Sequence, residues 1–210
     1  MSMIYLSYPA DITGITPMIE KTLVVVKPDG VKRSLIGEII SRFEKAGLKV
    51  VASKMTVVTK DLADQHYPAD RDELWIAIGN KTLDNYKALE MDAEKVLGTT
   101  DAKKIGDMVR VWLLDYIVSG PVFAMVLEGP HAVELVRKIC GHTLPLLSLP
   151  GTIRGDYSYD SSALANTAKR AIKNLMHASG NLEEAKYEIP LWFKKSEICS
   201  YTRTDEDIMK

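Results

Sequence analysis

Several basic and polar side chains stand at the ends of apolar runs in this sequence, where a folded chain displays functional groups. They are Lys27, Tyr67, Arg137, Thr143, Arg154, Asn174 and His177. An arginine guanidinium can bind two phosphate oxygens at once, and a lysine adds a mobile positive charge. Two arginines and a lysine therefore suit a polyphosphate, whereas each arginine taken singly is more often a solvated surface charge.

His177 is the candidate nucleophile of this set. It lies in NLMHASGN, where small and polar residues follow an apolar run. A free imidazole has a pKa of about 6.5 and is mostly neutral at pH 7, so one ring nitrogen keeps a lone pair for attack. The local pattern alone leaves three roles open for this histidine: buried core residue, metal ligand or nucleophile.

The motifs that usually announce phosphate or zinc binding do not occur in the sequence. Neither GxxxxGK[ST] nor GxGxxG is present, which disfavours a P-loop or a Rossmann fold. HExxH is also absent, and the four histidines, His66, His131, His142 and His177, lack the spacing of zinc ligands. A zinc site is therefore not expected.

The composition is that of a globular chain. Its 210 residues are 46% hydrophobic and 26% charged, which is enough for one well-buried domain. A net charge of -1 gives no electrostatic reason to expect binding to nucleic acids or to membranes. No run of about 18 apolar residues could span a membrane.

Cysteine content and the N-terminus bear on the compartment. Only two cysteines occur, Cys140 and Cys199, which are too few for a disulfide framework and indicate a reducing environment. The first residues lack the basic start of a signal peptide, and prolines interrupt their apolar positions. We therefore expect a cytoplasmic protein.

Hydrophobic periodicity predicts the elements that must position these side chains. Strands are predicted at 22–26, 48–58, 121–129 and 171–177, and the main helices at 34–47 and 131–141, with a short helix at 61–67. Ser34 is the expected N-cap and Gly47 the expected end of the first main helix. A last helix begins at Asn181, which forms a capping box with Glu184, and closes before Pro190.

The order strand, helix, strand, strand, helix, strand predicts an α+β fold of the ferredoxin-like βαββαβ type, with a mainly antiparallel four-stranded sheet. Two segments do not fit this plan. Residues 69–110 contain short helical patterns and are expected to form an inserted helical segment. Residues 157–170 are polar and aromatic, and we expect an extended surface loop or a short helix there.

Four blocks carry a family resemblance. They are EKTLVVVKPDGVKRSLIGEIISRFEKAGLKVVASKM, SGPVFAMVLEGPHAVELVRKICGHT, PGTIRGD, and NLMHASGN followed by EIPLWF. In order and content these blocks resemble the nucleoside diphosphate kinases, and PGTIRGD with N-x-x-H-x-S is a highly specific pair. The resemblance implies a phosphotransferase that moves the γ-phosphoryl group of a nucleoside triphosphate to a nucleoside diphosphate by a ping-pong reaction.

The resemblance also implies a role for each matching position. His177 matches the histidine that is phosphorylated, Glu188 the carboxylate that orients it, and Ser179 a hydroxyl beside it. The positions that match phosphate-binding groups are Lys27, Arg137, Thr143 and Arg154. Asn174 and Lys27 match groups that reach the sugar hydroxyls, and Tyr67 matches a tyrosine near the phosphohistidine.

Further expectations come from the resemblance alone. Mg²⁺ is the implied cofactor, held mainly through the nucleotide phosphates, so no acidic metal cage is expected. A homo-oligomer, hexamer or tetramer, is implied as well. The alternative is a family member that binds nucleotides as a regulatory or assembly subunit, with weak or no kinase activity. The complete set of site residues favours catalysis, because a chain released from that role would lose some of them.

The sequence departs from the common family pattern in three places. Residues 1–20 form an N-terminal extension before the kinase-like domain of residues 21–210, and the two insertions lie at about 69–110 and 157–170. A count back from SGPV places Val109 where the family has an aromatic residue that stacks on the base. We expect Trp112 or another apolar residue to replace that ring.

Overall fold

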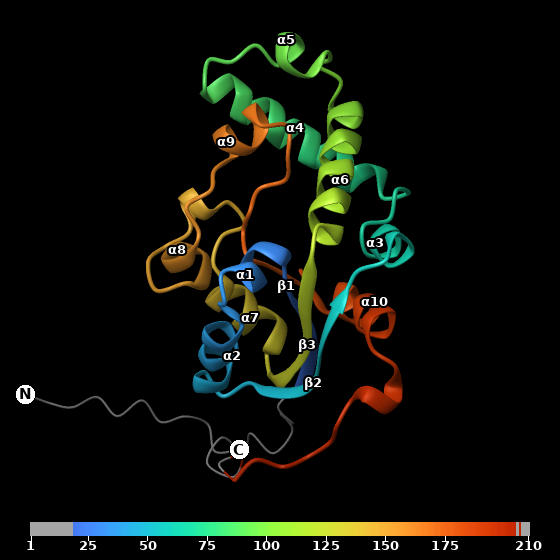
Figure 1. The fold of residues 1–210 in the computed structure, drawn as a ribbon, viewed down its shortest axis with the longest axis vertical. Helices are drawn as coiled ribbons and strands as arrows, with labels where there is room; N and C mark the ends of the chain where they lie inside the picture. Colours follow the sequence, from blue (N-terminus) through green and yellow to red (C-terminus); the bar gives the residue numbers. More distant parts are fainter. Residues whose placement is uncertain (1–18, 205, 207–210) are drawn as a thin grey trace, which may run out of the picture.

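A four-stranded antiparallel sheet forms the centre of the molecule (Figure 1). The computed structural model describes residues 19–204 and 206, so most of the expected extension over residues 1–20 lies outside the described residues. The strands are β1 Ile19–Val26, β2 Lys49–Val57, β3 Pro121–Pro130 and β4 Met176–Ala178. Their order is β2-β3-β1-β4, and each neighbouring pair is antiparallel. This confirms the predicted α+β, ferredoxin-like arrangement.

Helices surround this sheet. They are α1 Pro28–Lys32, α2 Ile36–Lys45, α3 Lys60–His66, α4 Asp72–Ala88, α5 Ala93–Leu97, α6 Ala102–Val118, α7 Ala132–Cys140, α8 Ile153–Tyr157, α9 Ser162–Thr167 and α10 Leu182–Trp192, with 3₁₀ turns at Pro145–Leu147 and Lys195–Glu197. Among the described helices, none is both long and apolar enough to cross a membrane.

The strand β1 is buried on both faces, which explains its unbroken run of apolar residues. Side chains alternate along a strand, so Val24 and Val26 face the core formed with α2, α7 and α8. Leu23 and Val25 face the opposite core, formed with α3, α6 and α10. Figure 1 shows α2 and α7 on one side of the sheet and α3 and α10 on the other.

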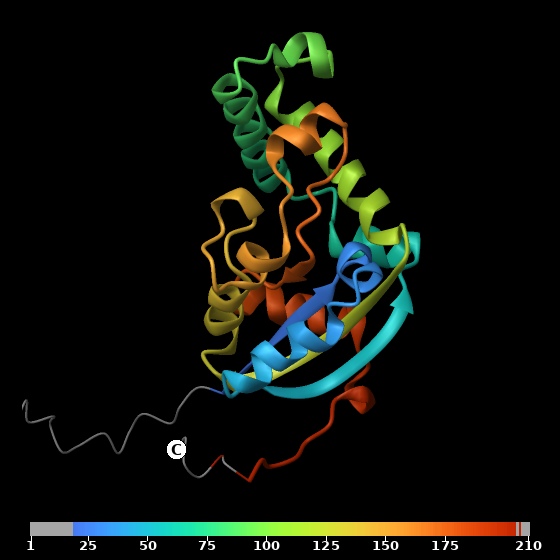
Figure 2. The same cartoon turned by 60° about the vertical axis from the view of Figure 1, so that its left-hand side comes forward.

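Helices α4, α5, α6 and α9 form an arm that extends beyond one end of the sheet (Figures 1 and 2). The arm has its own hydrophobic cluster around Tyr86 and Ile105, and Trp112 packs against this cluster. The hydroxyl of Tyr86 donates to the carbonyl of Asn166 at 3.3 Å. Residues from the 69–110 and 157–170 segments therefore pack together, and Trp112 contributes to the core of the arm.

Two glycines set the distance between α4 and α6. A Cβ at Gly79 would lie 1.8 Å from the carbonyl oxygen of Ala102, and one at Gly106 would lie 2.0 Å from that of Trp75. We expect Gly79→Ala to lower the free energy of unfolding by about 1–3 kcal/mol, because the backbones must separate. Chemical denaturation measures this change.

Gly37 in α2 is the matched control for this substitution. A Cβ there meets no atom within 4 Å, so Gly37→Ala should be neutral or stabilise the protein by up to about 1 kcal/mol through helix propensity. Equal unfolding curves for wild type and Gly79→Ala would contradict the close approach of the two helices.

The start of α2 differs from the sequence prediction. The helix begins at Ile36 with Leu35 at the N-cap, and no side chain caps it. Ser34, the predicted cap, has a φ of 58° and lies in the tight turn after α1. Its N–H donates to the carbonyl of Val31 at 2.9 Å, so a backbone turn takes the place of the predicted cap. The end of the helix is as predicted, with Gly47 in the left-handed region at φ 89°.

The fourth strand is shorter than predicted. A strand was expected over 171–177, but β4 comprises only Met176–Ala178. Side chains satisfy the preceding backbone, because the Lys173 N–H donates to Asp160 at 2.7 Å and the Leu175 N–H to Asp29 at 3.2 Å. The segment before His177 is therefore an irregular stretch fixed by carboxylates.

Helix α10 begins as predicted and ends later. The Asn181 side chain accepts from the Glu184 N–H at 2.9 Å, which confirms the N-cap, and the Glu184 carboxylate accepts from the Gly180 N–H at 2.7 Å. The prediction that the helix closes before Pro190 is wrong, since it continues to Trp192. A proline this close to the C-terminal end of a helix removes only one hydrogen bond of the last turn.

Candidate active site

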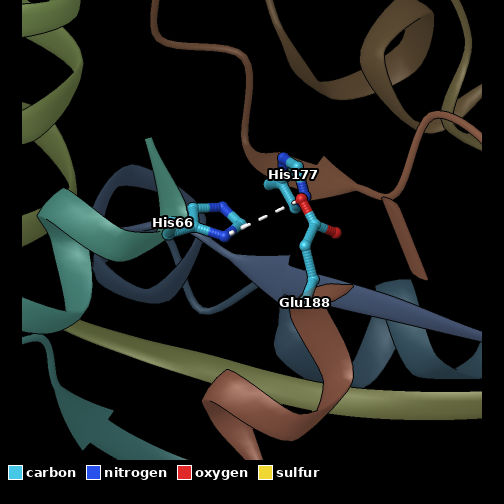
Figure 3. A group of neighbouring side chains, drawn as sticks. All are labelled: His66, His177 and Glu188. Atoms are coloured by element: carbon cyan, nitrogen blue, oxygen red, sulfur yellow. Dashed lines mark ion pairs between the residues drawn. The ribbon is translucent and has the colours of Figure 1, made fainter. Parts of the chain in front are cut away.

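His177, Glu188 and Ser179 meet beside β4. His177 pairs with Val25 of β1, and its Nε2 lies 2.9 Å from Oε1 of Glu188 on α10. Figure 3 shows the imidazole and the carboxylate facing each other. Nε2 has no well-aligned hydrogen bond here, so the contact is one of proximity and charge. The Ser179 hydroxyl donates to the other oxygen, Oε2, at 2.6 Å, which fixes the carboxylate.

The Glu188 carboxylate is ionised although it is only 4% exposed. Burial raises its pKa, but its interactions with His177, His66 and Ser179 outweigh burial and lower the pKa to about 2. An ionised carboxylate next to Nε2 favours the tautomer with the proton on that nitrogen. The lone pair is then on Nδ1, the nitrogen that faces away from Glu188.

His66 is a member of this group that the sequence prediction missed. It ends α3, is 4% exposed, and its ring centroid lies 4.3 Å from that of His177 at an interplanar angle of 81°. The Trp192 indole N–H donates to its Nδ1 at 3.3 Å. Burial first, and then the charge of His177, hold the pKa of His66 well below its usual value, so this imidazole is neutral. In the sequence, only its position next to Tyr67 indicated that His66 belongs to this site.

Tyr67 lies on the outer side of His66. Its ring centroid is 4.6 Å from that of His66 and 6.5 Å from that of His177. Burial, followed by the charge of Glu188, raises the pKa of the Tyr67 hydroxyl. The hydroxyl therefore stays protonated at neutral pH and can donate a hydrogen bond, as the predicted role near the histidine requires.

Lys27 and Asn174 form a buried polar pair at the end of β1. The Lys27 ammonium donates to Oδ1 of Asn174 at 2.9 Å, and the Asn174 amide donates to the carbonyl of Thr143 at 3.0 Å. Burial and the charge of Arg154 lower the pKa of Lys27 to about 7, against the opposing influence of Asp29. The positive charge of the Lys27 ammonium is thus only partly balanced by nearby groups, and it can attract an anionic ligand.

This lowered pKa predicts that nucleotide binding depends on pH. Lys27 carries its charge below about pH 7 and loses it above, so the affinity for ADP should fall as the pH rises from 6 to 9, by at most about tenfold per unit. Calorimetric titration with ADP at several pH values measures this. In Lys27→Arg the charge persists, and the fall over this range should disappear; an equally steep fall in that variant would contradict the assignment.

Arg154 is held by the main chain around β4. Its Nε donates to the carbonyl of Asn174 at 3.0 Å, Nη1 to that of Gly141 at 2.8 Å and Nη2 to that of Met176 at 2.8 Å. The side chain is 7% exposed, and burial lowers its pKa. A guanidinium has five N–H donors, so two remain for a ligand. Arg154 is fixed in place before any phosphate arrives.

Arg137 and Thr143 lie at the edge of this network. Both side chains are exposed, and Arg137 lines an open pocket of about 490 Å³ with Glu134, Gly180 and Asn181. Its charge lies close enough to Arg154 to lower that residue's pKa. The structure thus brings seven predicted residues into one group and leaves these two at its rim.

Two further residues, which were not predicted, lie beside Lys27. The Lys27 ammonium lies 5.1 Å from the centre of the Tyr116 ring, a cation–π distance. Asp29 accepts from the Leu175 N–H through Oδ2, while its buried Oδ1 has no hydrogen-bond partner among the described atoms. Asp29 is in KPDG, directly after Lys27, so its place in the motif was the available signal. Tyr116 reaches Lys27 only through the packing of α6.

The site places a candidate nucleophile near the cationic side chains of Lys27 and Arg154, which can bind an anion. Both His177 and Lys27 act on the pKa of His66, and both Glu188 and Arg154 act on that of Tyr67, so the buried cationic side chains lie near the histidine pair. Preorganised cations can stabilise the negative charge of a phosphoryl group as it is transferred. This arrangement fits attack by a histidine on a terminal phosphate.

The family model for nucleoside diphosphate kinase matches residues 20–77 and 83–198. A nucleoside diphosphate kinase of Pyrobaculum aerophilum is 47% identical over 181 residues, which are 86% of this chain and 98% of that protein. One from Borreliella burgdorferi is 42% identical over 191 residues, which are 90% of this chain and 96% of that protein.

Solved structures agree with these relatives. The crystal structure of the Pyrobaculum aerophilum kinase superposes with a TM-score of 0.84 at 45% identity, covering 87% of this chain and all of that one. The Borrelia burgdorferi kinase, solved as a transition-state mimic with bound vanadate and ADP, gives a TM-score of 0.71 at 42% identity and covers 90% and 95%. On the family match, these identities and this coverage, the chain belongs to the nucleoside diphosphate kinase family.

Proposed function

We propose that this nucleoside diphosphate kinase works through a phosphohistidine at His177. In the first half-reaction the Nδ1 lone pair attacks the γ-phosphorus and forms an N–P bond. The bond from phosphorus to the bridging oxygen breaks, and the nucleoside diphosphate leaves with that electron pair. In the second half-reaction a terminal oxygen of another nucleoside diphosphate attacks the phosphorus, and the N–P electron pair returns to Nδ1.

The observation that carries this proposal is the 2.9 Å contact between His177 Nε2 and the ionised Glu188. It favours the tautomer with its lone pair on Nδ1 and stabilises the positive charge that the ring gains on phosphorylation. Arg154 and Lys27 supply positive charge for the phosphate oxygens. The bound vanadate and ADP of the Borrelia burgdorferi relative support phosphoryl transfer at this kind of site.

Mg²⁺ fits this proposal as an ion that arrives with the nucleotide. The side chains predicted to hold the phosphates are Lys27, Arg137, Thr143 and Arg154. The three cations among them suit phosphate oxygens and repel a bare cation. Asp29 is a carboxylate near this group, because its charge opposes the lowering of the Lys27 pKa. When bound, Mg²⁺ neutralises charge on the phosphates.

Labelling tests the proposal directly. Incubation with γ-labelled ATP should give a protein-bound label that is acid-labile and base-stable and that moves to added GDP. The alternative function, a nucleotide-binding regulatory or assembly subunit, would instead give ADP binding without a transferable label. A label that is stable to acid would place the phosphoryl group on a residue other than histidine.

Glu188→Gln tests the orienting carboxylate. The variant keeps the shape of the side chain but removes the charge, so Nε2 loses its preference for the proton. We expect kcat to fall by on the order of 10²–10⁴ with little change in ADP affinity. Steady-state kinetics and ADP titration measure both quantities.

Glu183→Gln is the control on the same helix, because Glu183 is exposed and pairs with Lys186 at the surface. It should keep wild-type kcat. If Glu188→Gln also keeps wild-type kcat, the carboxylate does not orient His177.

A homo-oligomer remains part of this proposal. Three large apolar side chains, Leu146, Leu147 and Leu149, are 77%, 60% and 73% exposed in one short segment. Clusters of exposed apolar side chains commonly mark protein interfaces. Mass measurement in solution tests this, and a monomer at working concentrations would contradict it.

A further inference from the structure

Three side chains of the types that bind transition metals converge behind the proposed nucleophile (Figure 3). His66, His177 and Glu188 each offer one ligand atom, and these atoms all lie within 4.8 Å of one another. The residues come from α3, β4 and α10, so the packing of three elements brings them together. This explains why the spacing of histidines in the sequence gave no indication of a metal site.

The distances suit a small tetrahedral ion. Oε1 of Glu188 lies 2.9 Å from Nε2 of His177 and 3.8 Å from Nδ1 of His66. Zinc bonds to histidine nitrogen and carboxylate oxygen are about 2.0–2.1 Å, which places the ligands of a tetrahedral ion about 3.3 Å apart. These two separations lie on either side of this value, and all three ligand atoms lie within 4.8 Å of one another, so side-chain rotations would bring them around the ion.

The ligand atoms are ready to bind. Nδ1 of His66 accepts the indole N–H of Trp192 at 3.3 Å, so it is the unprotonated nitrogen of a buried ring, and this long contact is easily exchanged for a metal bond. Glu188 is ionised. Nε2 of His177 is buried and lies 2.9 Å from the same carboxylate, so a metal there would replace the proton that Glu188 favours on this nitrogen.

The ligand types select the ion. Two imidazoles and one carboxylate, with a fourth position left for water, are a set that binds zinc. Mg²⁺ prefers six oxygen ligands in an octahedron and keeps several waters. The cluster is therefore distinct in its chemistry from the Mg²⁺ that accompanies the nucleotide.

We propose that His66, His177 and Glu188 bind Zn²⁺ or a similar divalent transition-metal ion, and that this ion switches phosphoryl transfer off. The second part rests on the proposed role of His177. A metal on Nε2 takes the lone pair of that nitrogen, so the single proton of the neutral ring must be on Nδ1. Nδ1 then has no lone pair for phosphorus, and Glu188 no longer orients the ring. The metal and the phosphoryl group require opposite tautomers of one histidine.

Metal binding is measured first, without nucleotide. Chelator-treated full-length protein is titrated with Zn²⁺ by calorimetry and with Co²⁺ by visible absorption, which reports tetrahedral coordination. We expect one ion per chain in the cluster, bound at least about 10-fold more weakly in His66→Gln and in Glu188→Gln. His131→Gln removes an exposed histidine of the α7 N-terminus and should leave the affinity unchanged. Circular dichroism establishes that each variant is folded.

Inhibition is measured second. Zn²⁺-loaded and metal-free protein are diluted into excess Mg²⁺ and γ-labelled ATP, and the initial rate of labelling is compared. We expect at least a tenfold slower rate after loading, restored by a chelator, and no such effect in His66→Gln. Zn²⁺ affinity that is unchanged in both variants, or a loaded enzyme that labels at the metal-free rate, would overturn the proposal. Metal-free protein that does not label at all would refute the kinase mechanism, whereas the binding titrations would still decide the metal site.

Discussion

His177→Ala should abolish phosphoryl transfer, with a loss of at least about 10⁴-fold in kcat/KM. The substitution removes the nitrogen that would bond to phosphorus, and among the described residues of the buried group the remaining imidazole, His66, lies behind the site with its Nδ1 directed to Trp192. Acid-labile label on the protein should disappear, while ADP affinity should change little because Lys27 and Arg154 remain. Rapid-quench labelling and ADP titration measure the two effects separately.

His177→Gln and His131→Ala are the companion variants. Glutamine fills most of the space of the ring and keeps a polar group near Glu188, so it separates loss of the nucleophile from loss of packing; it should be as inactive as alanine. His131 is exposed and lines the outer pocket with Arg137 rather than the buried group around His177, so its loss should leave the rate unchanged. Acid-labile label at the wild-type level in His177→Ala would refute the assigned nucleophile.

Arg154→Lys should produce the second large effect, on both activity and stability. Lysine keeps the charge but cannot bind three carbonyls at once and also hold a phosphate. We expect kcat/KM to fall by on the order of 10²–10³, and the free energy of unfolding to fall by about 2–4 kcal/mol because the buried carbonyls of Gly141, Asn174 and Met176 lose their donors. Denaturant unfolding and steady-state kinetics measure these changes.

Arg42→Lys is the matched control. Arg42 also donates to a carbonyl, that of Gly151 at 3.1 Å, and it pairs with Glu38 and Asp156, but it is partly exposed and lies away from His177. We expect a change of no more than about 1 kcal/mol in stability and a wild-type rate. If Arg154→Lys behaves like this control, its bonds to the β4 segment are not what fixes the site.

Most of the elements could be predicted because their signals are local. The run TLVVV is apolar on both faces, and β1 is buried on both faces; Asn181 and Glu184 predicted the start of α10, and Gly47 the end of α2. The extent of β4 could not be predicted because distant side chains satisfy the backbone before it. Asp160 and Asp29 take the N–H groups that a longer β4 would have paired with its neighbour, and no periodicity in 171–177 reveals them.

The candidate residues were predicted from type and motif, and their arrangement was not. The sequence by itself determined which segments are strands and helices, because their periodicity is a property of near neighbours. It also determined the reactive groups, because imidazole, carboxylate and guanidinium are properties of single residues. Only the tertiary structure decided that Arg154 is held by three carbonyls, that Arg137 lies at the rim, and that His66 packs against His177. These contacts join segments far apart in the chain, and they depend on the packing of α3, β4, α8 and α10 around one end of the sheet.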